Sequence, residues 1–131
     1  MSQELKKSLF LATAEAILIY GCEAWTLSTK EETSLNGCYT RMNVSGSDKV
    51  RNEVLYGNLP KVTDKIRKRR LELAGHCTRH SELEASDLVL WEPIQGKTSR
   101  GSQKLTYVDM LRRDTGLKST GELRLLTQDK C

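Results

Sequence analysis

One short segment of the sequence concentrates residues that can bind a phosphate backbone. It is a run of cations interrupted only by Ile66, and Asp64 and Glu72 are the nearest acids. On a helix such a run spreads positive charge over more than half of the circumference, which is wider than a solvated face balanced by acids. The alternative is a solvated charge run or a nuclear localisation signal. We predict that the main phosphate contacts are Lys65, Arg67, Lys68, Arg69 and Arg70, with Arg79, Lys97, Arg100 and Lys104 as secondary contacts.

A second group of residues has the atom types that bind zinc. His76, Cys77 and His80 are close in sequence, and the two histidines are four residues apart on one helix face. Cys22 or Cys38 could complete such a site. Structural zinc sites usually combine two close ligand pairs, and this sequence has one. The favoured alternative is a helix end with a buried cysteine and imidazoles near the last carbonyls, so no metal or other cofactor is expected.

Catalytic motifs are missing from the sequence. It has no glycine-rich phosphate loop, no G-x-S-x-G, no H-E-x-x-H, and neither an Asp-Asp pair nor D-x-D. A two-metal phosphoryl-transfer site would need such paired carboxylates. We therefore expect no enzymatic activity from this chain by itself, and no small-molecule substrate.

Size and charge limit the class of protein. The chain has 131 residues, of which 37% are hydrophobic and 29% charged, so it has room for one domain or two subdomains around a thin core. The net charge is +4, but residues 1–60 carry −1 and residues 61–131 carry +5. The excess positive charge therefore lies in the second half, as expected if that half contacts a polyanion.

The cysteines and the N-terminal region indicate an intracellular protein. Four cysteines are present without a CxxC pair, which favours free thiols in a reducing compartment. Lys6 and Lys7 precede an apolar run at residues 9–20, as in a signal peptide, but Glu15 interrupts the run and no cleavage site follows. The run is also too short to span a membrane, so no membrane association is expected. The basic run suggests the nucleus.

Hydrophobic spacing predicts an all-α fold of short helices with a basic loop. A first helix should bury a stripe and end at Gly21, and a second, at residues 30–42, should begin with a capping box between Thr29 and Glu32. Helices are also expected at residues 49–56, 63–79 and 106–115, the last closed by Gly116. The predicted stripe of the first helix consists of Leu5, Leu9, Ala12, Ala16 and Ile19.

The remaining segments are less regular. Residues 85–91 fit a short helix or a strand, residues 93–104 form a polar loop with three cations, and Ser119 with Glu122 predicts a capping box that opens a last helix. The larger aromatic side chains could stack on bases, but we expect them in the core. These are Trp25, Tyr39, Trp91 and Tyr107.

Four blocks of the sequence resemble the C-terminal part of the reverse transcriptases of non-LTR retrotransposons. Residues 20–27 resemble the family's Y-G-x-E-x-W-T-L, and residues 66–76 resemble I-R-x-R-R-L-x-x-x-G-H. Residues 91–101 resemble W-E-P-x-x-G-K-x-x-R-G, and residues 106–114 resemble T-[WY]-x-D…[KR]-D. The blocks follow the family's order and cover about residues 9–117.

The resemblance implies the thumb and post-thumb part of an RNA-directed DNA polymerase, which would hold a template–primer duplex. The family's Tyr-x-Asp-Asp motif, which supplies the metal-binding aspartates, is absent. We therefore expect a thumb-like helical subdomain at residues 1–60 and a basic helical subdomain at residues 61–131. Together they would form a non-catalytic fragment that binds an RNA–DNA or DNA duplex without sequence preference. The alternatives are a structural or interaction relic without nucleic-acid activity, and a small zinc-binding module.

The sequence departs from the family at two places. Met42 leads directly into Asn43-Val44-Ser45, and Gly46 stands where the family has tryptophan. Burial of a large aromatic side chain contributes about 2–3 kcal/mol, so its loss predicts a domain of marginal stability. The family's R-G-R-P is Arg100-Gly101-Ser102-Gln103 in this chain, which removes one cation from the basic loop.

Overall fold

A computed structural model describes residues 2–43, 61–93 and 105–128, and these residues form helices without a strand. The predicted all-α class is therefore confirmed. The first half contains α1 (Gln3–Phe10), the π-helix η1 (Leu11–Glu15), α2 (Ala16–Leu18), the 3-10 helix η2 (Cys22–Ala24) and α3 (Thr29–Asn43). The second half contains α5 (Val62–Arg79), α6 (Glu84–Val89), α7 (Tyr107–Thr115) and α8 (Thr120–Gln128).

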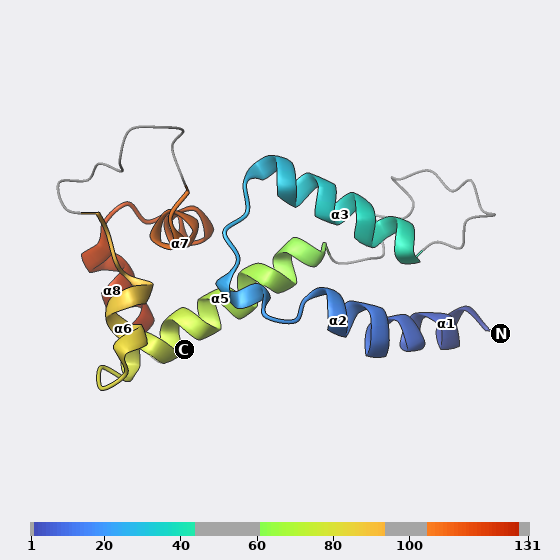
Figure 1. Cartoon of the computed structure of the whole chain (residues 1–131), viewed down its shortest axis with the longest axis horizontal. Helices are drawn as coiled ribbons and strands as arrows, with labels where there is room; N and C mark the ends of the chain where they lie inside the picture. Colours follow the sequence, from blue (N-terminus) through green and yellow to red (C-terminus); the bar gives the residue numbers. More distant parts are fainter. Residues whose placement is uncertain (1, 44–60, 94–104, 129–131) are drawn as a thin grey trace.

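The long helix α5 connects the two halves of the fold. Figure 1 shows α1, α2 and α3 on the side of its N-terminal end, and α6, α7 and α8 grouped around its C-terminal part. α5 contacts η2 and α3 from the first half and α6, α7 and α8 from the second. These five described elements are therefore positioned relative to α5, whose first turns carry the basic run.

Two hydrophobic clusters form the core, and α5 contributes to both. The first contains Ile19, Cys22 and Tyr39 together with Val62 and Ile66 from α5. The second contains Ala74 and Cys77 from α5, packed with Val89, Leu90, Val108, Leu111 and Leu123. The first cluster thus takes residues from both sides of the predicted boundary between residues 60 and 61.

The first helix does not bury the predicted stripe. Leu5 and Leu9 are 56% and 54% exposed, and Ala12 and Ala16 are also exposed, so Ile19 alone reaches the core. The π-helix at Leu11–Glu15 adds a residue to the turn, so Leu5 and Leu9 before it are out of register with Ile19 after it by about 100° around the axis. The side chains turned toward the core are those of Phe10, Glu15 and Ile19.

The capping box of α3 lies one residue before the predicted one. Ser28 accepts the first helical hydrogen bond through its carbonyl, from the Glu32 amide at 3.0 Å. The Ser28 amide and hydroxyl both donate to Oε2 of Glu31 at 2.7 Å, and the Glu31 amide donates to Ser28 Oγ at 3.4 Å. The pair is therefore Ser28–Glu31, and Thr29 is the first helical residue. Glu32, the predicted capping partner, instead forms an ion pair with Arg113 of α7.

The helices of the second half agree better with the sequence. α5 begins one residue before the predicted start, and the segment at residues 85–91 proves to be helical up to Val89, in α6 (Glu84–Val89). α7 has a capping box between Thr106 and Asp109 and ends at Gly116, whose φ of 75° is the left-handed conformation that favours glycine. In α8 Leu123 is buried, whereas the equally apolar Leu126 is 50% exposed. The predicted helix at residues 49–56 and the segment around Gly46, which departs from the family, lie outside the described residues.

Candidate nucleic-acid interface

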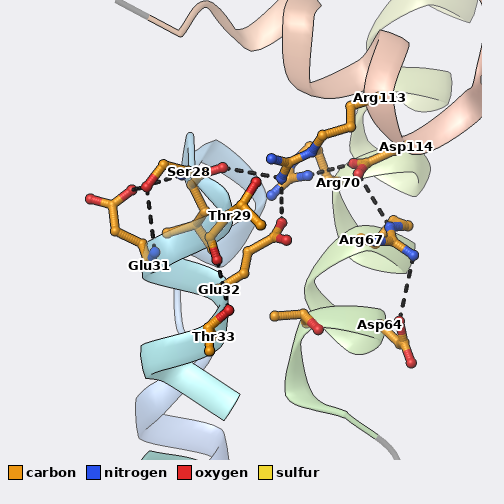
Figure 2. A network of polar contacts seen from close by, with 12 residues as sticks. Ser28, Thr29, Glu31, Glu32, Thr33, Asp64, Arg67, Arg70, Arg113 and Asp114 are labelled. Carbon is orange, nitrogen blue, oxygen red and sulfur yellow. Dashed lines mark hydrogen bonds and ion pairs between the residues drawn. The ribbon is translucent and has the colours of Figure 1, made fainter. Parts of the chain in front are cut away.

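Two cations of the basic run are turned toward α7. Arg67 donates from Nε to Oδ1 of Asp114 at 3.2 Å, and Arg70 donates from Nη1 to Oδ2 of the same carboxylate. The side chains of Arg70 and Asp114 are only 2% and 1% exposed, whereas that of Arg67 is about half exposed. Figure 2 shows both guanidinium groups directed at Asp114. One buried carboxylate thus holds two of the five cations in place.

The position of Arg70 does not fit a phosphate contact. Its guanidinium is enclosed by the fold, and its Nε is buried without a hydrogen-bond partner among the described residues. Reaching a phosphate would require breaking a buried ion pair, which costs several kcal/mol. We therefore remove Arg70 from the predicted contacts. Arg70 lies one turn after the buried Ile66 and one turn before the buried Ala74, and its whole side chain is buried with them.

Lys65 forms a second inward contact. Its Nζ lies 2.6 Å from Oε1 of Glu15, and the Tyr39 hydroxyl donates to the other oxygen of this carboxylate. Lys65 Nζ also lies 6.0 Å from the centroid of the Tyr39 ring. Burial raises the pKa of Glu15, but the hydrogen bonds from Lys65 and Tyr39 outweigh it, so the pKa is lowered and the carboxylate stays charged. The lysine remains partly exposed.

Arg69 reaches back to the segment that follows α2. Its Nη1 donates to the carbonyl of Ile19 at 3.4 Å and lies 3.8 Å from Oε1 of Glu23. The side chain is about half exposed, so the ion pair is accessible to water and screened by salt. These contacts hold the guanidinium of Arg69, and the side chain is still accessible to solvent.

The remaining cation of the run points into solvent. Lys68 is 78% exposed, and its one acidic neighbour among the described residues is Glu72, at 4.0 Å. Lys65 and Lys68 follow the spacing that places side chains on one helix face, and Arg79 lies three turns further along that face. Lys61 is the exposed N-cap residue directly before α5, one turn ahead of Lys65. We call these four cations the outer face of α5. Lys61 was missed in the sequence because it precedes the run, although its spacing to Lys65 was a usable signal.

The secondary contacts divide into two groups. Arg79 is exposed, but its Nη1 donates to the carbonyl of Thr127 at 3.0 Å and so connects α5 to α8. Lys97, Arg100 and Lys104 lie outside the described residues. The described part of the candidate interface is therefore the outer face of α5.

The three candidate zinc ligands do not converge. Cys77 is buried in the second hydrophobic cluster, whereas His76 and His80 are exposed. The reason is helix geometry, because neighbouring residues are about 100° apart around the axis. Cys22 is buried in the first cluster and Cys38 is exposed on α3. Within the ranges that the structure describes, no three His, Cys, Asp or Glu side chains are grouped so that they could hold a metal ion.

The sequence led us to expect the four larger aromatic side chains in the core, but the structure does not place all of them there. Tyr39 is buried, and Trp25 and Tyr107 are half-buried. Trp91, which follows the short helix α6, is 56% exposed. The core assignment is therefore wrong for Trp91, whose indole ring is accessible from solvent.

The sequence blocks that resemble reverse transcriptases are connected to one another. The Tyr107 hydroxyl donates to the carbonyl of Glu23 at 2.8 Å, which ties the last block to the first, and burial raises the pKa of Tyr107 to about 12. Asp114 ties the last block to the second through its two arginines. Glu92 ties the third block to α7 through an ion pair with Arg112. Many residues that carry the resemblance thus hold the fold together.

Arg113 adds a further connection between the halves. Its Nη2 donates to the carbonyl of Leu27 at 3.1 Å and to Glu32 in the first turn of α3. Figure 2 places this guanidinium next to Arg70 and Asp114. The junction between α3, α5 and α7 is therefore a network of charges, and cations that looked available in the sequence are engaged within it.

Comparisons of the chain with protein-family models, with curated proteins and with solved structures found no match. The likeness to reverse transcriptases therefore depends on the four sequence blocks. Among the described helices, none combines the length and the apolar character that crossing a membrane requires.

Proposed function

We propose that this chain is a non-catalytic, thumb-like fragment of a reverse transcriptase of the non-LTR retrotransposon type, and that it binds nucleic acid through phosphate contacts. In this proposal it acts inside the cell, in the nucleus, where its partner is an RNA–DNA or DNA duplex. It needs no cofactor and performs no chemistry by itself.

The outer face of α5 is the observation that carries this proposal. Lys61 and Lys68 are exposed there, and Lys65 is partly exposed between them. The acids on the same side of the helix are Asp64 and Glu72, so the cations outnumber the acids. A straight row of cations can follow a phosphate backbone, and each contact releases counterions. The contact set is smaller than the sequence indicated, because Arg70 is buried, Arg67 is held by Asp114 and Lys65 is held by Glu15, which leaves Lys61 and Lys68 as the exposed cations of this row.

A fluorescence anisotropy titration tests the proposal. The full chain is added to a labelled RNA–DNA hybrid at several salt concentrations, and circular dichroism confirms that the protein is helical. We expect binding that weakens with salt, with a slope of about −0.9 for each phosphate contact if B-form DNA is used as a guide. A folded protein that does not bind at low salt would refute the proposal.

A second function is favoured by an exposed apolar surface. Leu5 and Leu9 on α1, with Ile17 and Tyr20 further along, are more than half exposed. Apolar side chains gathered on one segment are typical of protein contacts, so the chain could instead be a structural module that associates with further copies of itself. Sedimentation over a range of concentrations separates the two. Self-association that Leu9→Ser with Ile17→Ser abolishes, without nucleic-acid binding, would favour the structural module.

A further inference from the structure

Two imidazole rings lie together at the C-terminal end of α5, where the proposed function does not use them. The centroids of the His76 and His80 rings are 4.5 Å apart, with an angle of 52° between the planes. The His80 amide donates to the His76 carbonyl at 3.2 Å, so the helical hydrogen-bond pattern continues to His80. Both residues are exposed. The backbone therefore holds two imidazoles one helical turn apart and open to solvent.

A carboxylate lies beside the second ring. Oε1 of Glu82 is 3.0 Å from Nδ1 of His80. When Nδ1 donates a hydrogen bond to a carboxylate, the imidazole is fixed in the tautomer whose Nε2 carries the free electron pair. This arrangement of carboxylate and histidine is typical of histidines that bind metal ions, because the carboxylate orients the ring and makes it more basic.

We propose that His76 and His80 together bind one divalent transition-metal ion, with Glu82 orienting His80 and water completing the coordination. Two imidazoles suit Ni²⁺, Cu²⁺ and Zn²⁺, whose affinities for nitrogen ligands follow a known order with Cu²⁺ strongest. Cys77 takes no part, because it is buried in the second hydrophobic cluster. This is not the structural zinc module considered from the sequence, since an exposed two-histidine site does not hold the fold together. It is also independent of the nucleic-acid proposal.

The charges around the two rings are compatible with a cation. Glu82 follows His80 by two residues, and its carboxylate lies beside the His80 ring. The nearest cation in sequence is Arg79, and its guanidinium is engaged by the carbonyl of Thr127 on α8. The arginine is therefore held by a backbone contact outside the histidine pair.

Isothermal titration with Ni²⁺ tests the site. Ni²⁺ is chosen because, unlike Cu²⁺, it does not readily oxidise thiols, and the protein carries Cys38→Ser and Cys131→Ser to remove two competing sulfur ligands. We expect saturable binding of one ion per chain. His76→Gln and His80→Gln should each abolish it, and Glu82→Gln should weaken it by about tenfold. Glu72→Gln, which leaves both imidazoles and Glu82 in place, is the matched control and should bind like the parent protein.

A stability measurement gives a second readout. A ligand that binds only the folded state raises the unfolding temperature, so Ni²⁺ should raise it in the parent protein and not in the two histidine variants. Without metal, the variants should unfold like the parent, since both side chains are exposed. Absence of saturable binding by the parent, or unchanged binding by either histidine variant, would overturn the proposal. Unchanged binding by Glu82→Gln would overturn the role given to Glu82.

Discussion

Asp114 on α7 and Arg70 on α5 form an ion pair in which both side chains are buried. Arg70 lies midway along α5, between Ile66 of the first hydrophobic cluster and Ala74 of the second. The pair therefore connects the C-terminal helices to the part of α5 where the two clusters meet. A charge in this place is tolerated only because its partner is fixed opposite to it.

Replacement of Asp114 should be among the most damaging changes in the chain. Asp114→Ala leaves Arg70 buried without its counter-charge, and breaking such a pair costs about 3–5 kcal/mol. Urea denaturation followed by circular dichroism measures the loss of stability. Asp64→Asn is the matched control, because the contact of Asp64 with Arg67 is exposed, and it should change stability by less than about 1 kcal/mol. Equal effects of the two variants would show that the Arg70–Asp114 pair is not buried in solution.

The lowered pKa of Glu15 predicts a dependence of stability on pH. Since the folded-state pKa lies below the usual 4.5, the charged carboxylate contributes stability above that pH and loses the contribution as pH falls through the lower folded value. Glu15→Gln removes the titrating group. The wild type should therefore be more stable than the variant at neutral pH, and the difference should shrink as acid is added. A difference that stays constant down to pH about 3 would argue against the contact with Lys65 and Tyr39.

The position of the α3 cap can be tested with two neighbouring substitutions. Ser28→Ala removes the hydroxyl that contacts Glu31 and should cost about 1 kcal/mol of stability. Thr29→Ala replaces the first helical residue, whose side chain does not cap the helix, and should have a smaller effect. Thermal unfolding of both variants under one set of conditions gives the comparison. If Thr29→Ala proved the more damaging, the cap expected from the sequence would be correct.

The register of α1 also makes a prediction about which side chains face the core. Phe10 contacts the ring of Tyr39 edge-on, with centroids 5.4 Å apart, whereas Leu9 is exposed. Phe10→Ala should cost about 1–3 kcal/mol, and Leu9→Ala should stay within about 0.5 kcal/mol. A regular α-helix in the predicted register would reverse this order, so equilibrium unfolding of the two variants decides between the registers.

Much of the second half of the fold could be predicted because its signals are local. Thr106 and Asp109 are three residues apart, and Gly116 ends the same helix, so the segment from Thr106 to Gly116 contains both capping signals. Arg70 shows the limit of this reasoning. Its partner Asp114 is 44 residues away, and nothing near Arg70 in the sequence indicates a buried carboxylate. The wide spread of cations, taken as a sign of phosphate binding, is explained in part by acids on other helices.

The first half shows a different limit. Leu5, Leu9, Ala12 and Ala16 fit a regular helical stripe, and no residue in the run marks the extra residue in the turn at Leu11–Glu15. The one sequence signal that the stripe was wrong was Glu15, a charged residue that interrupts the apolar run. It served as an argument against a signal peptide, whereas in the structure it is buried and holds Tyr39 and Lys65. A charge within an apolar helix can therefore indicate a buried partner.

Comparison of two pairs of lysines tests the proposed interface most directly. Lys61→Ala with Lys68→Ala removes two exposed cations from the outer face of α5, and Lys30→Ala with Lys118→Ala removes two exposed cations elsewhere. Both variants lose the same net charge and should fold normally. On a labelled RNA–DNA hybrid, the first pair should weaken binding and reduce the salt slope by about 1 for each lysine, and the second should change it much less. Equal effects of the two pairs, or no effect of the first, would contradict binding through the outer face of α5.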